Sequence, residues 1–374
     1  MAESVSWLKA MDPRETKLNI LLFALPITLY FNYVNQNHSM AFFSSLIAIM
    51  PLAFLMGRAT EEIALRTTES LGGLLNATFG NAAELIIAVL LILEASRVAD
   101  PETQSFFIQL VQASLIGSIL GNLLLVMGLA FVWGGIHHSE QKYSETQVSS
   151  NGSLLLLSMI VLVIPTVFHS SVGAEGGDSR LLDLSHIAAA ILLLVYGLFL
   201  LFQFRTHVHL FATDGSHHEE PEMTQRDSII LLVVATVLVS WMAEILVHSV
   251  EYAAEDFGLP HLFIGVILLP LFGNAAEHFT AVTVAGKDKM DLSFAISMGS
   301  STQIAVFIAP LMVIIAWALG VPLTFEFGTL ETVSAFLAVL IVNSIAADGK
   351  SNWLEGAMLL SSYGVLAAAF LFHP

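Results

Sequence analysis

The sequence contains no cysteine. Disulfide bonds, thiolate zinc sites and iron–sulfur clusters are therefore excluded, so oxygen and imidazole are the remaining metal ligands. Lysine and arginine are also scarce, with 13 residues against 31 aspartates and glutamates and a net charge of −18. Because nucleic acid binding requires a basic surface, this balance excludes nucleic acid as a partner. Such a charge suits a protein that handles cations.

Two common enzyme motifs are missing as well. The sequence has no His-Glu-x-x-His metalloprotease motif and no Gly-x-Ser-x-Gly nucleophile elbow, so we expect no enzyme activity and no cofactor. The first apolar run, from Lys17 to Val34, is long and is not followed by a small-residue cleavage pattern. We therefore interpret it as a retained membrane span, not as a signal peptide.

Apolar residues make up more than half of the sequence. The chain of 374 residues is 56% hydrophobic and only 12% charged, with a mean hydropathy of +0.79, which is too apolar for a soluble domain of this length. The predicted fold class is an all-α polytopic membrane protein embedded in a lipid bilayer. Its eleven predicted spans, each about 17 to 28 residues long, begin near Leu18, Ser39, Gly72, Phe106, Ser149, Leu184, Ser228, His261, Leu292, Glu326 and Trp353.

The positive residues test this number of spans, because they are enriched in cytoplasmic loops. With the N-terminus inside, ten of them fall in inner loops, two (Arg97 and Arg180) fall in outer loops, and Arg58 falls within a span. The inner ten are Lys9, Arg14, Lys17, Arg66, Lys142, Arg205, Arg226, Lys287, Lys289 and Lys350. The pattern predicts a cytoplasmic N-terminus and a C-terminus on the far side.

One hexapeptide, Phe-Gly-Asn-Ala-Ala-Glu, occurs twice inside apolar stretches, at 79–84 and at 272–277. A carboxylate in the hydrocarbon layer costs roughly 2.5 to 3.5 kcal/mol on insertion scales, so it is usually present for function. In each copy the asparagine and the glutamate are three residues apart, so on a helix they present two oxygen ligands from one face. Glu84, Glu277, Asn81 and Asn274 are therefore the predicted cation ligands. The alternative is helix packing, which explains the glycine and alanines but not two buried acids.

The positions of the two motifs predict an inverted repeat. Glu84 lies in the second of spans two to six, and Glu277 lies in the second of spans seven to eleven. Because five is odd, the halves have opposite orientations, and the expected site lies at their interface near the bilayer midplane. The predicted organisation is an N-terminal segment with the first span (1–38), a first five-helix repeat (39–206), an acidic cytoplasmic linker (207–227) and a second five-helix repeat (228–374).

Weaker internal similarities name secondary candidates. Glu62 aligns with Glu244, and each either relays protons, lines the cation path, pairs with Arg58 or sits near water at a span end. Residues of the span after each motif either bind the cation or simply hydrogen-bond between helices; they are Ser118, Asn122, Ser300 and Gln303. His278 follows Glu277 directly, but successive helical residues point about 100° apart, so packing or proton relay is favoured over shared ligation.

The one clearly polar segment lies between the halves. Its histidine and glutamate cluster either senses cytoplasmic Ca²⁺ or pH, because histidine titrates near neutrality, or is a solvated acidic linker, which is the preferred interpretation. The cluster consists of His217, His218, Glu219, Glu220 and Glu222.

The sequence resembles the cation/proton exchangers of the Ca²⁺/cation antiporter superfamily. The resemblance is carried by Gly-Asn-Ala-Ala-Glu at 80–84 with the preceding 72–79, by 273–278, by Ala-Thr-Glu-Glu at 59–62 and by Gly-Ser-Ser-Thr-Gln at 299–303, and it covers nearly the whole chain. It implies a secondary active Ca²⁺/H⁺ antiporter whose Glu84 and Glu277 bind cation and proton by turns. Exchange coupled to Na⁺ or K⁺ and, less favoured, a passive cation channel are the alternatives.

The residues themselves suggest how such a site would work. Two facing carboxylates in a low-dielectric layer cannot both ionise cheaply without a cation, so the site holds either protons or a metal ion. An acidic, flexible, all-oxygen site suits Ca²⁺ better than Mg²⁺ or Zn²⁺, while Mn²⁺ remains an alternative. We expect transported Ca²⁺ and H⁺ as substrates, a homo-oligomer as a further option, and a prokaryotic plasma membrane as the location.

Overall fold

The structure is a computed structural model that describes residues 5–67, 71, 72, 75, 78–172, 177–208 and 221–373. Within these residues, nine helices are long and apolar enough to cross a membrane, and the bent pair His261–Gly273 and Ala275–Ala285 makes a tenth span. The span predicted to begin near Gly72 lies partly outside the described residues, and its second part is the helix α5 (Ala82–Arg97). The prediction of an all-α polytopic membrane protein is confirmed.

The helices are interrupted by short π-helical or 3₁₀ segments, labelled η. The first half contains α1 (Trp7–Ala10), η1 (Lys17–Phe23), α2 (Ala24–Leu29), η2 (Tyr30–Val34), α3 (His38–Ala64), α5, α6 (Pro101–Leu120), η3 (Gly121–Val126), α7 (Met127–His137), β1 (Gln141–Lys142), α8 (Glu145–Val172), α9 (Gly177–Leu201) and η4 (Phe202–Thr206). The second half contains α10 (Gln225–Phe257), α11 (His261–Phe263), η6 (Ile264–Leu268), α12 (Leu269–Gly273), α13 (Ala275–Ala285), α14 (Met290–Gln303), η7 (Ile304–Ile308), α15 (Ala309–Ala318), α16 (Thr329–Ile345), η8 (Ala346–Asp348), β2 (Lys350–Ser351) and α17 (Trp353–Leu371).

Contacts between these elements divide the chain into two compact units. Unit 1 comprises Met1–Leu90, Ala212–Leu259 and Leu271–Glu277, and unit 2 comprises Leu91–Phe211, Pro260–Pro270 and His278–Pro374. Each unit therefore combines segments from both halves of the sequence. The second hexapeptide, up to its glutamate, belongs to the same unit as the first. The division into two five-helix repeats stays a prediction.

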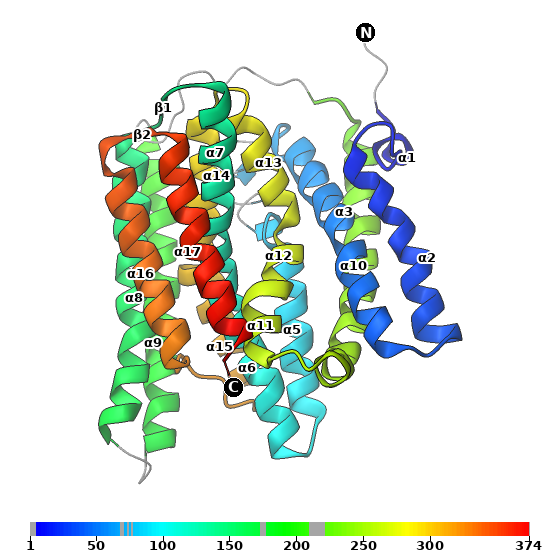
Figure 1. The fold of residues 1–374 in the computed structure, drawn as a ribbon, viewed down its shortest axis with the longest axis vertical. Helices are drawn as coiled ribbons and strands as arrows, with labels where there is room; N and C mark the ends of the chain where they lie inside the picture. Colours follow the sequence, from blue (N-terminus) through cyan, green and yellow to red (C-terminus); the bar gives the residue numbers. More distant parts are fainter. Residues whose placement is uncertain are drawn as a thin grey trace. The chain divides into compact units, whose positions relative to one another are not determined.

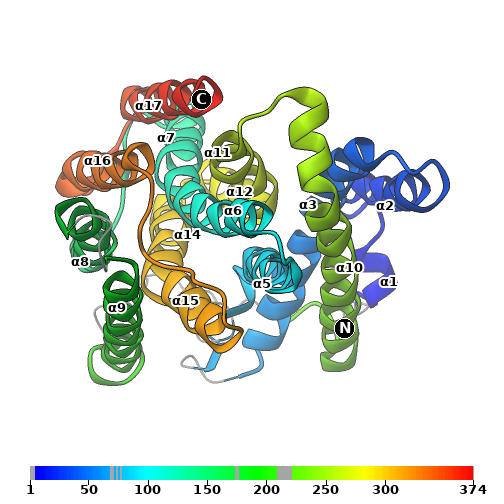
Figure 2. The same cartoon turned by 90° about the horizontal axis from the view of Figure 1, so that it is seen from below.

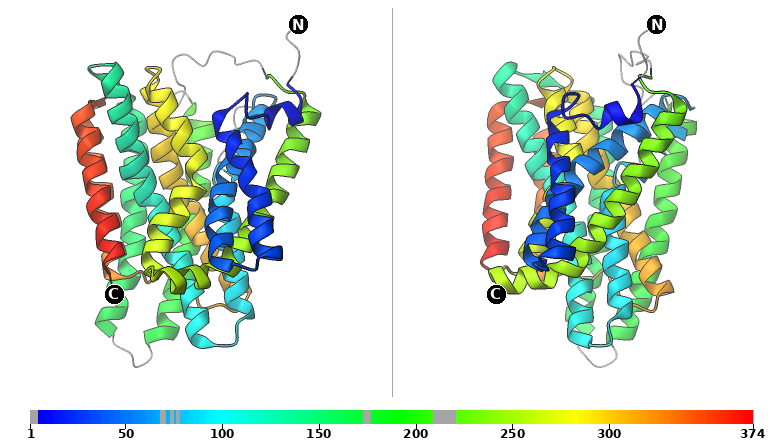
Figure 3. Two further views of the ribbon diagram at one scale, coloured as in Figure 1. Left: turned by 45° about the vertical axis from the view of Figure 1, so that its right-hand side comes forward. Right: turned by 90° about the vertical axis from the view of Figure 1, so that its right-hand side faces the viewer.

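Unit 1 is built on α3 and α10, which pack along most of their length (Figure 1). The side chain of Asn37 caps the start of α3 by accepting from the Met40 N–H at 2.9 Å, and Gly258, with a φ of 59°, ends α10 in the left-handed conformation that glycine favours. The start of α3 lies beside the end of α10: Ser39 donates to the Asp256 carboxylate, and the rings of His38 and Tyr252 stack with centroids 4.6 Å apart. Helix α2 packs on the outside of α3 (Figure 3).

In unit 2, small residues let helices approach closely. Helix α17 packs on α7 and helix α16 packs on α8 (Figure 2). A Cβ at Gly356 of α17 would lie 2.6 Å from the Gly128 carbonyl oxygen and the Val132 nitrogen of α7, so these two backbones are in direct contact. Close backbone contact of this kind is how membrane helices associate when hydrophobic burial gives little advantage over lipid.

A two-stranded ribbon ties three loops of unit 2 together. Strand β1 pairs antiparallel with β2, and Gln141 of β1 also donates to the Ala285 carbonyl (3.0 Å) and the Asp288 carboxylate (2.9 Å) in the loop after α13. The Tyr143 hydroxyl donates to the Lys350 carbonyl at 2.7 Å. Burial, together with the nearby carboxylates of Asp348 and Glu355, raises the pKa of Tyr143, so it stays a neutral donor. These bonds fix the ends of α7, α13 and α16 relative to one another.

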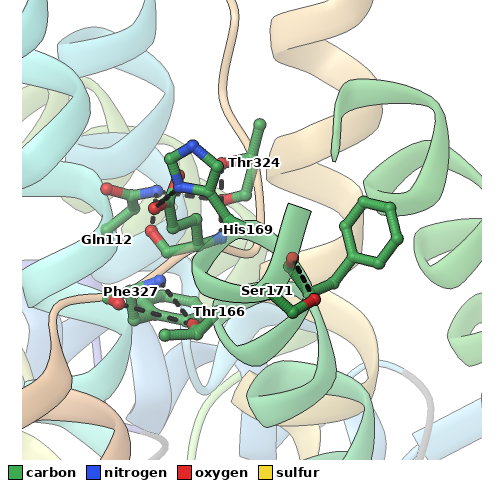
Figure 4. A network of polar contacts seen from close by, with 8 residues as sticks. Gln112, Thr166, His169, Ser171, Thr324 and Phe327 are labelled. Carbon is green, nitrogen blue, oxygen red and sulfur yellow. Dashed lines mark hydrogen bonds and ion pairs between the residues drawn. The ribbon is translucent and has the colours of Figure 1, made fainter. Parts of the chain in front are cut away.

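The segment between α15 and α16 is held by side chains from three other helices, and Figure 4 shows those from α6 and α8. The Gln112 amide of α6 donates to the carbonyls of Thr324 and Glu326, each at 2.9 Å, and Ser185 of α9 accepts from the Phe325 N–H at 3.1 Å. On α8, His169 pairs with the Glu326 carboxylate. Phe325 is 1% exposed, so this irregular backbone is buried in protein, where its polar groups must find partners.

Gly117 and Gly299 occupy equivalent positions of the predicted repeats but have different surroundings. A Cβ at Gly117 of α6 would lie 2.2 Å from the Val266 carbonyl oxygen of η6, whereas a Cβ at Gly299 of α14 would meet nothing within 4 Å. Because backbone cannot move aside as a flexible side chain can, Gly117→Ala should be destabilising by about 1–3 kcal/mol or more. Gly299→Ala should be neutral, or stabilising by up to about 1 kcal/mol, because alanine favours helix.

Thermal unfolding of the purified protein in detergent tests this difference. We expect an apparent melting temperature lower by about 1–4 °C for Gly117→Ala and an unchanged or slightly higher one for Gly299→Ala. Equal melting temperatures for the two variants would contradict the close approach of α6 and η6.

Candidate cation site

The two hexapeptides adopt the same local structure. Thr78 and Phe79 are helical, Gly80 and Asn81 form a turn, and α5 begins at Ala82; in the second copy α12 ends at Gly273, Asn274 forms the turn, and α13 begins at Ala275. The second break bends its helix pair by 58°. The motifs therefore interrupt their spans at the asparagine, and the following helix restarts two residues before the acid.

This geometry differs from the prediction that the asparagine and the glutamate of each motif lie on one face of a continuous helix. The asparagines lie in the break, and Glu84 and Glu277 each lie in the first turn of the helix that follows it. The N–H groups of a first helical turn have no partner inside the helix, and together with the helix dipole they favour negative charge. Each acid thus lies at the positive end of a helix dipole, directly after a break in its span.

The structure brings the two motifs together. A Cβ built on Gly273 would lie 3.7 Å from Cγ, 3.9 Å from Cδ and 4.0 Å from Oε1 of Glu84. The carboxyl group of the first motif therefore lies against the backbone of the second, one residue before Asn274. Both Gly273 and Glu84 belong to unit 1.

Polar groups at this place are buried. Asn81 and Asn274 are each 1% exposed, and Oε1 of Glu84 is buried and accepts no hydrogen bond from the described residues. A buried polar atom without a partner is costly and is typical of a site that receives a ligand. The described residues contain no group of three or more histidine, cysteine, aspartate or glutamate side chains arranged for a metal ion. A cation here would therefore depend on amide and backbone oxygens in addition to the acids.

Glu62 and Glu244, which align in sequence, lie in different surroundings. Glu62 is 6% exposed and accepts the backbone N–H groups of Glu222 (3.1 Å) and Met223 (3.0 Å), whereas Glu244 is exposed on α10. Arg58 pairs with Glu222 at 3.2 Å. The structure therefore gives Glu62 partners that none of the alternatives from the sequence included, namely two backbone N–H groups at the end of the linker.

The polar candidates of the later spans lie in unit 2. Asn122 is fully buried in η3, and its amide donates to the Ser300 hydroxyl of α14 at 2.9 Å. Ser118 is 2% exposed, and Gln303 is the last residue of α14 before η7. The π-helical segments η3 and η7 interrupt the two corresponding spans at similar places, and such segments are frequent at functional sites. The structure thus joins Asn122 and Ser300 directly.

The remaining candidates are placed only in part. His278 is the residue of α13 that directly follows Glu277, and its Nε2 is buried without a hydrogen-bond partner among the described residues. Glu222 of the linker is described, whereas His217, His218, Glu219 and Glu220 lie outside the described residues. The sequence marks Gly273 as a small residue that loosens the backbone before the acid, but not as a contact of Glu84, and it does not mark Met223. The duplicated motif was a signal for the glycine, and no signal pointed to the methionine.

Comparison with known proteins gives one consistent family. The profile of the sodium/calcium exchanger protein family matches residues 38–205 and 227–372. A protein of Aphanothece halophytica named Ca(2+)/H(+) antiporter is 44% identical over 370 residues, which are 95% of this chain and 96% of that protein. A vacuolar calcium ion transporter of Schizosaccharomyces pombe is 38% identical, over 100% of this chain and 90% of that protein.

A solved structure has the same fold. The native structure of YfkE superposes with a TM-score of 0.81 at 36% sequence identity, and the match covers 95% of this chain and 99% of that one.

Proposed function

Because the chain belongs to the sodium/calcium exchanger protein family, and within it to the cation/proton exchangers, we propose that it is a secondary active Ca²⁺/H⁺ antiporter. It exports cytosolic Ca²⁺ in exchange for protons by alternating access. Relatives named Ca(2+)/H(+) antiporter and vacuolar cation/proton exchanger support this activity, as does YfkE, which is named a Ca2+/H+ antiporter. The observation that carries the proposal is the position of the Glu84 carboxyl group against Gly273, where the two motifs meet.

In this proposal Glu84 and Glu277 provide the charge, and Asn81, Asn274 and nearby carbonyls complete the oxygen shell around Ca²⁺. A hard cation such as Ca²⁺ takes six to eight oxygen ligands, and its flexible shell tolerates irregular backbone carbonyls. Protons replace the cation on the same carboxylates, because a buried acid is neutral either when it is protonated or when it is paired with a metal ion. If the units rearrange only when the charge is neutralised, this competition couples the two fluxes.

The predicted topology completes the proposal. The excess of lysine and arginine in alternate loops supports an N-terminus in the cytoplasm, with the linker on the same side. We propose that the protein lies in a prokaryotic plasma membrane and that it assembles as a homo-oligomer. In this topology the two predicted five-helix repeats, 39–206 and 228–374, have opposite orientations in the membrane, as is usual in carriers that work by alternating access.

Uptake into proteoliposomes tests the proposed exchange. With the lumen acidic relative to the bath, Ca²⁺ uptake should depend on the imposed pH gradient, saturate with Ca²⁺, and fall to the level of empty vesicles when a protonophore dissipates the gradient. Replacing the pH gradient with a Na⁺ or K⁺ gradient should give no comparable uptake. Uptake that needs no gradient and does not saturate would indicate a channel and contradict the proposal.

A further inference from the structure

Two residues just before α10, Glu222 and Met223, are bound by side chains from elsewhere in unit 1. We call these two residues the strap. Glu62 of α3 accepts the Glu222 N–H on Oε1 at 3.1 Å and the Met223 N–H on Oε2 at 3.0 Å. One carboxylate thus binds two successive backbone donors, and charge-assisted bonds of this kind are about twice as strong as neutral ones.

Two arginines complete the contact from the same end of α3. Arg58 pairs with the Glu222 carboxylate at 3.2 Å, and Arg66, just after the helix, donates to the Met223 carbonyl. Positions 58 and 62 are four residues apart, so they lie on one face of α3, one turn from each other. The Met223 side chain is 1% exposed, so the strap is also anchored by an apolar group.

The N-terminal segment binds the other edge of the strap. The Val5 N–H donates to the Glu222 carbonyl at 2.9 Å, and Val5 forms a parallel β-bridge with Met223. Two residues later the Trp7 N–H donates to Asp227 at 3.4 Å, in the first turn of α10. With these contacts all four backbone N–H and carbonyl groups of the strap have partners.

The arrangement argues against cation binding by Glu62. Both of its carboxylate oxygens already accept N–H donors, and the residue is 6% exposed. A cation at Glu62 would have to displace two donors, leave buried N–H groups without partners, and sit near the positive charge of Arg58.

We propose that Glu62 is a positioning residue: with Arg58 and Arg66 it docks the strap on the end of α3 and so holds the start of α10 and the N-terminal segment in register with α3. At the other end of the same pair, Ser39 and His38 contact Asp256 and Tyr252. Helices α3 and α10 are therefore fixed to each other at both ends and move as one body. The effect on transport described below rests on the proposed function, whereas the docking itself does not.

The absence of cysteine makes the docking directly measurable. With Val5→Cys and Met223→Cys the chain has a single cysteine pair, placed at bridge partners whose spacing permits a disulfide. Oxidation of the full-length protein should give a high yield of the intramolecular disulfide. Adding Glu62→Gln, which keeps only one acceptor oxygen, should lower the rate of disulfide formation at least about fivefold. Adding Glu102→Gln, which removes the same charge from an exposed residue in the first turn of α6, should leave the rate unchanged.

A protease gives an independent measurement. The endoproteinase that cleaves after glutamate should cut the Glu222–Met223 bond slowly while the strap is docked and at least about tenfold faster in Glu62→Gln, with the fragment ends identified by mass spectrometry. Arg58→Ala combined with Arg66→Ala should accelerate the same cleavage, and this variant keeps the proposal testable if Glu62→Gln does not fold. Unchanged disulfide formation and cleavage in these variants would overturn the docking.

Transport separates positioning from cation binding. In Glu62→Gln we expect a maximal uptake rate several-fold lower and a KM for Ca²⁺ within about twofold of the parent. Oxidising the cysteine pair, which replaces the docking with a covalent bond, should restore most of the rate. A KM raised tenfold with disulfide formation intact would place Glu62 on the cation path and contradict the proposal. If the parent showed no proton-coupled uptake, the proposed function would fail, while the disulfide and protease results would still decide the docking.

Discussion

Glu277→Gln is expected to reduce Ca²⁺ uptake driven by a pH gradient to less than about 1% of the parent rate. Glutamine has nearly the same shape as glutamate, but it carries no charge and cannot exchange a proton. One of the two carboxylates that repay the dehydration of Ca²⁺ is therefore lost, and the same change removes one of the groups that return protons. Glu84→Gln should have the same effect, because the two motifs are equivalent in sequence and in local structure.

The control for this prediction is Glu102→Gln, which removes an exposed carboxylate from the first turn of α6. It should leave the uptake rate within about twofold of the parent. Both proteins should elute as single peaks from a sizing column in detergent, so that loss of activity is not confused with loss of folding. Substantial uptake by Glu277→Gln would assign the duplicated motif to the scaffold and require another cation site.

Gly273→Val is expected to lower uptake at least about 100-fold, while Gly273→Ala should stay within about threefold of the parent. The first methyl group would lie 3.7 Å from Cγ of Glu84, an ordinary van der Waals contact. The two methyl groups of valine extend about 1.5 Å further, into the space that the Glu84 carboxyl group occupies. Displacing this group by even about 1 Å spoils the geometry of a preorganised site.

The alanine and valine variants form a matched pair, because both remove glycine's conformational freedom and valine adds two methyl groups beyond Cβ. Initial uptake rates at saturating Ca²⁺ and the KM for Ca²⁺ should be measured for both. If alanine were as damaging as valine, the requirement would lie in the backbone of the break and not in contact with Glu84. If both were active, the two motifs would not need to meet for transport.

Features encoded by neighbouring residues could be predicted from the sequence. The apolar runs predict membrane helices, which the structure confirms, and the repeated hexapeptide predicts that the two acids belong to one site. The sequence also predicts a loosened backbone near the motif, because glycine precedes the asparagine in both copies. It did not predict that the helix restarts two residues before the acid, because that depends on which hydrogen bonds the tertiary structure leaves available.

Contacts between distant residues could not be predicted. Glu62 binds the backbone of Glu222, 160 residues away, and a backbone N–H group has no signature in the sequence. For the same reason the sequence predicts equivalent roles for Glu62 and Glu244, although Glu62 binds the strap and Glu244 is exposed. Gly117 and Gly299 occupy matching Gly-Ser pairs, and only the structure shows that Gly117 lies against backbone.

The unequal surroundings of Glu62 and Glu244 have a kinetic consequence. A carrier built from two identical halves would run equally fast in both directions, whereas here one of the two aligned carboxylates is buried against backbone N–H groups and the other is exposed. Such asymmetry cannot change the final ion ratio, which the two gradients alone determine by detailed balance. It can change how quickly that ratio is approached from each side. Uptake and efflux measured at mirrored gradients should therefore differ in rate while reaching the same steady state.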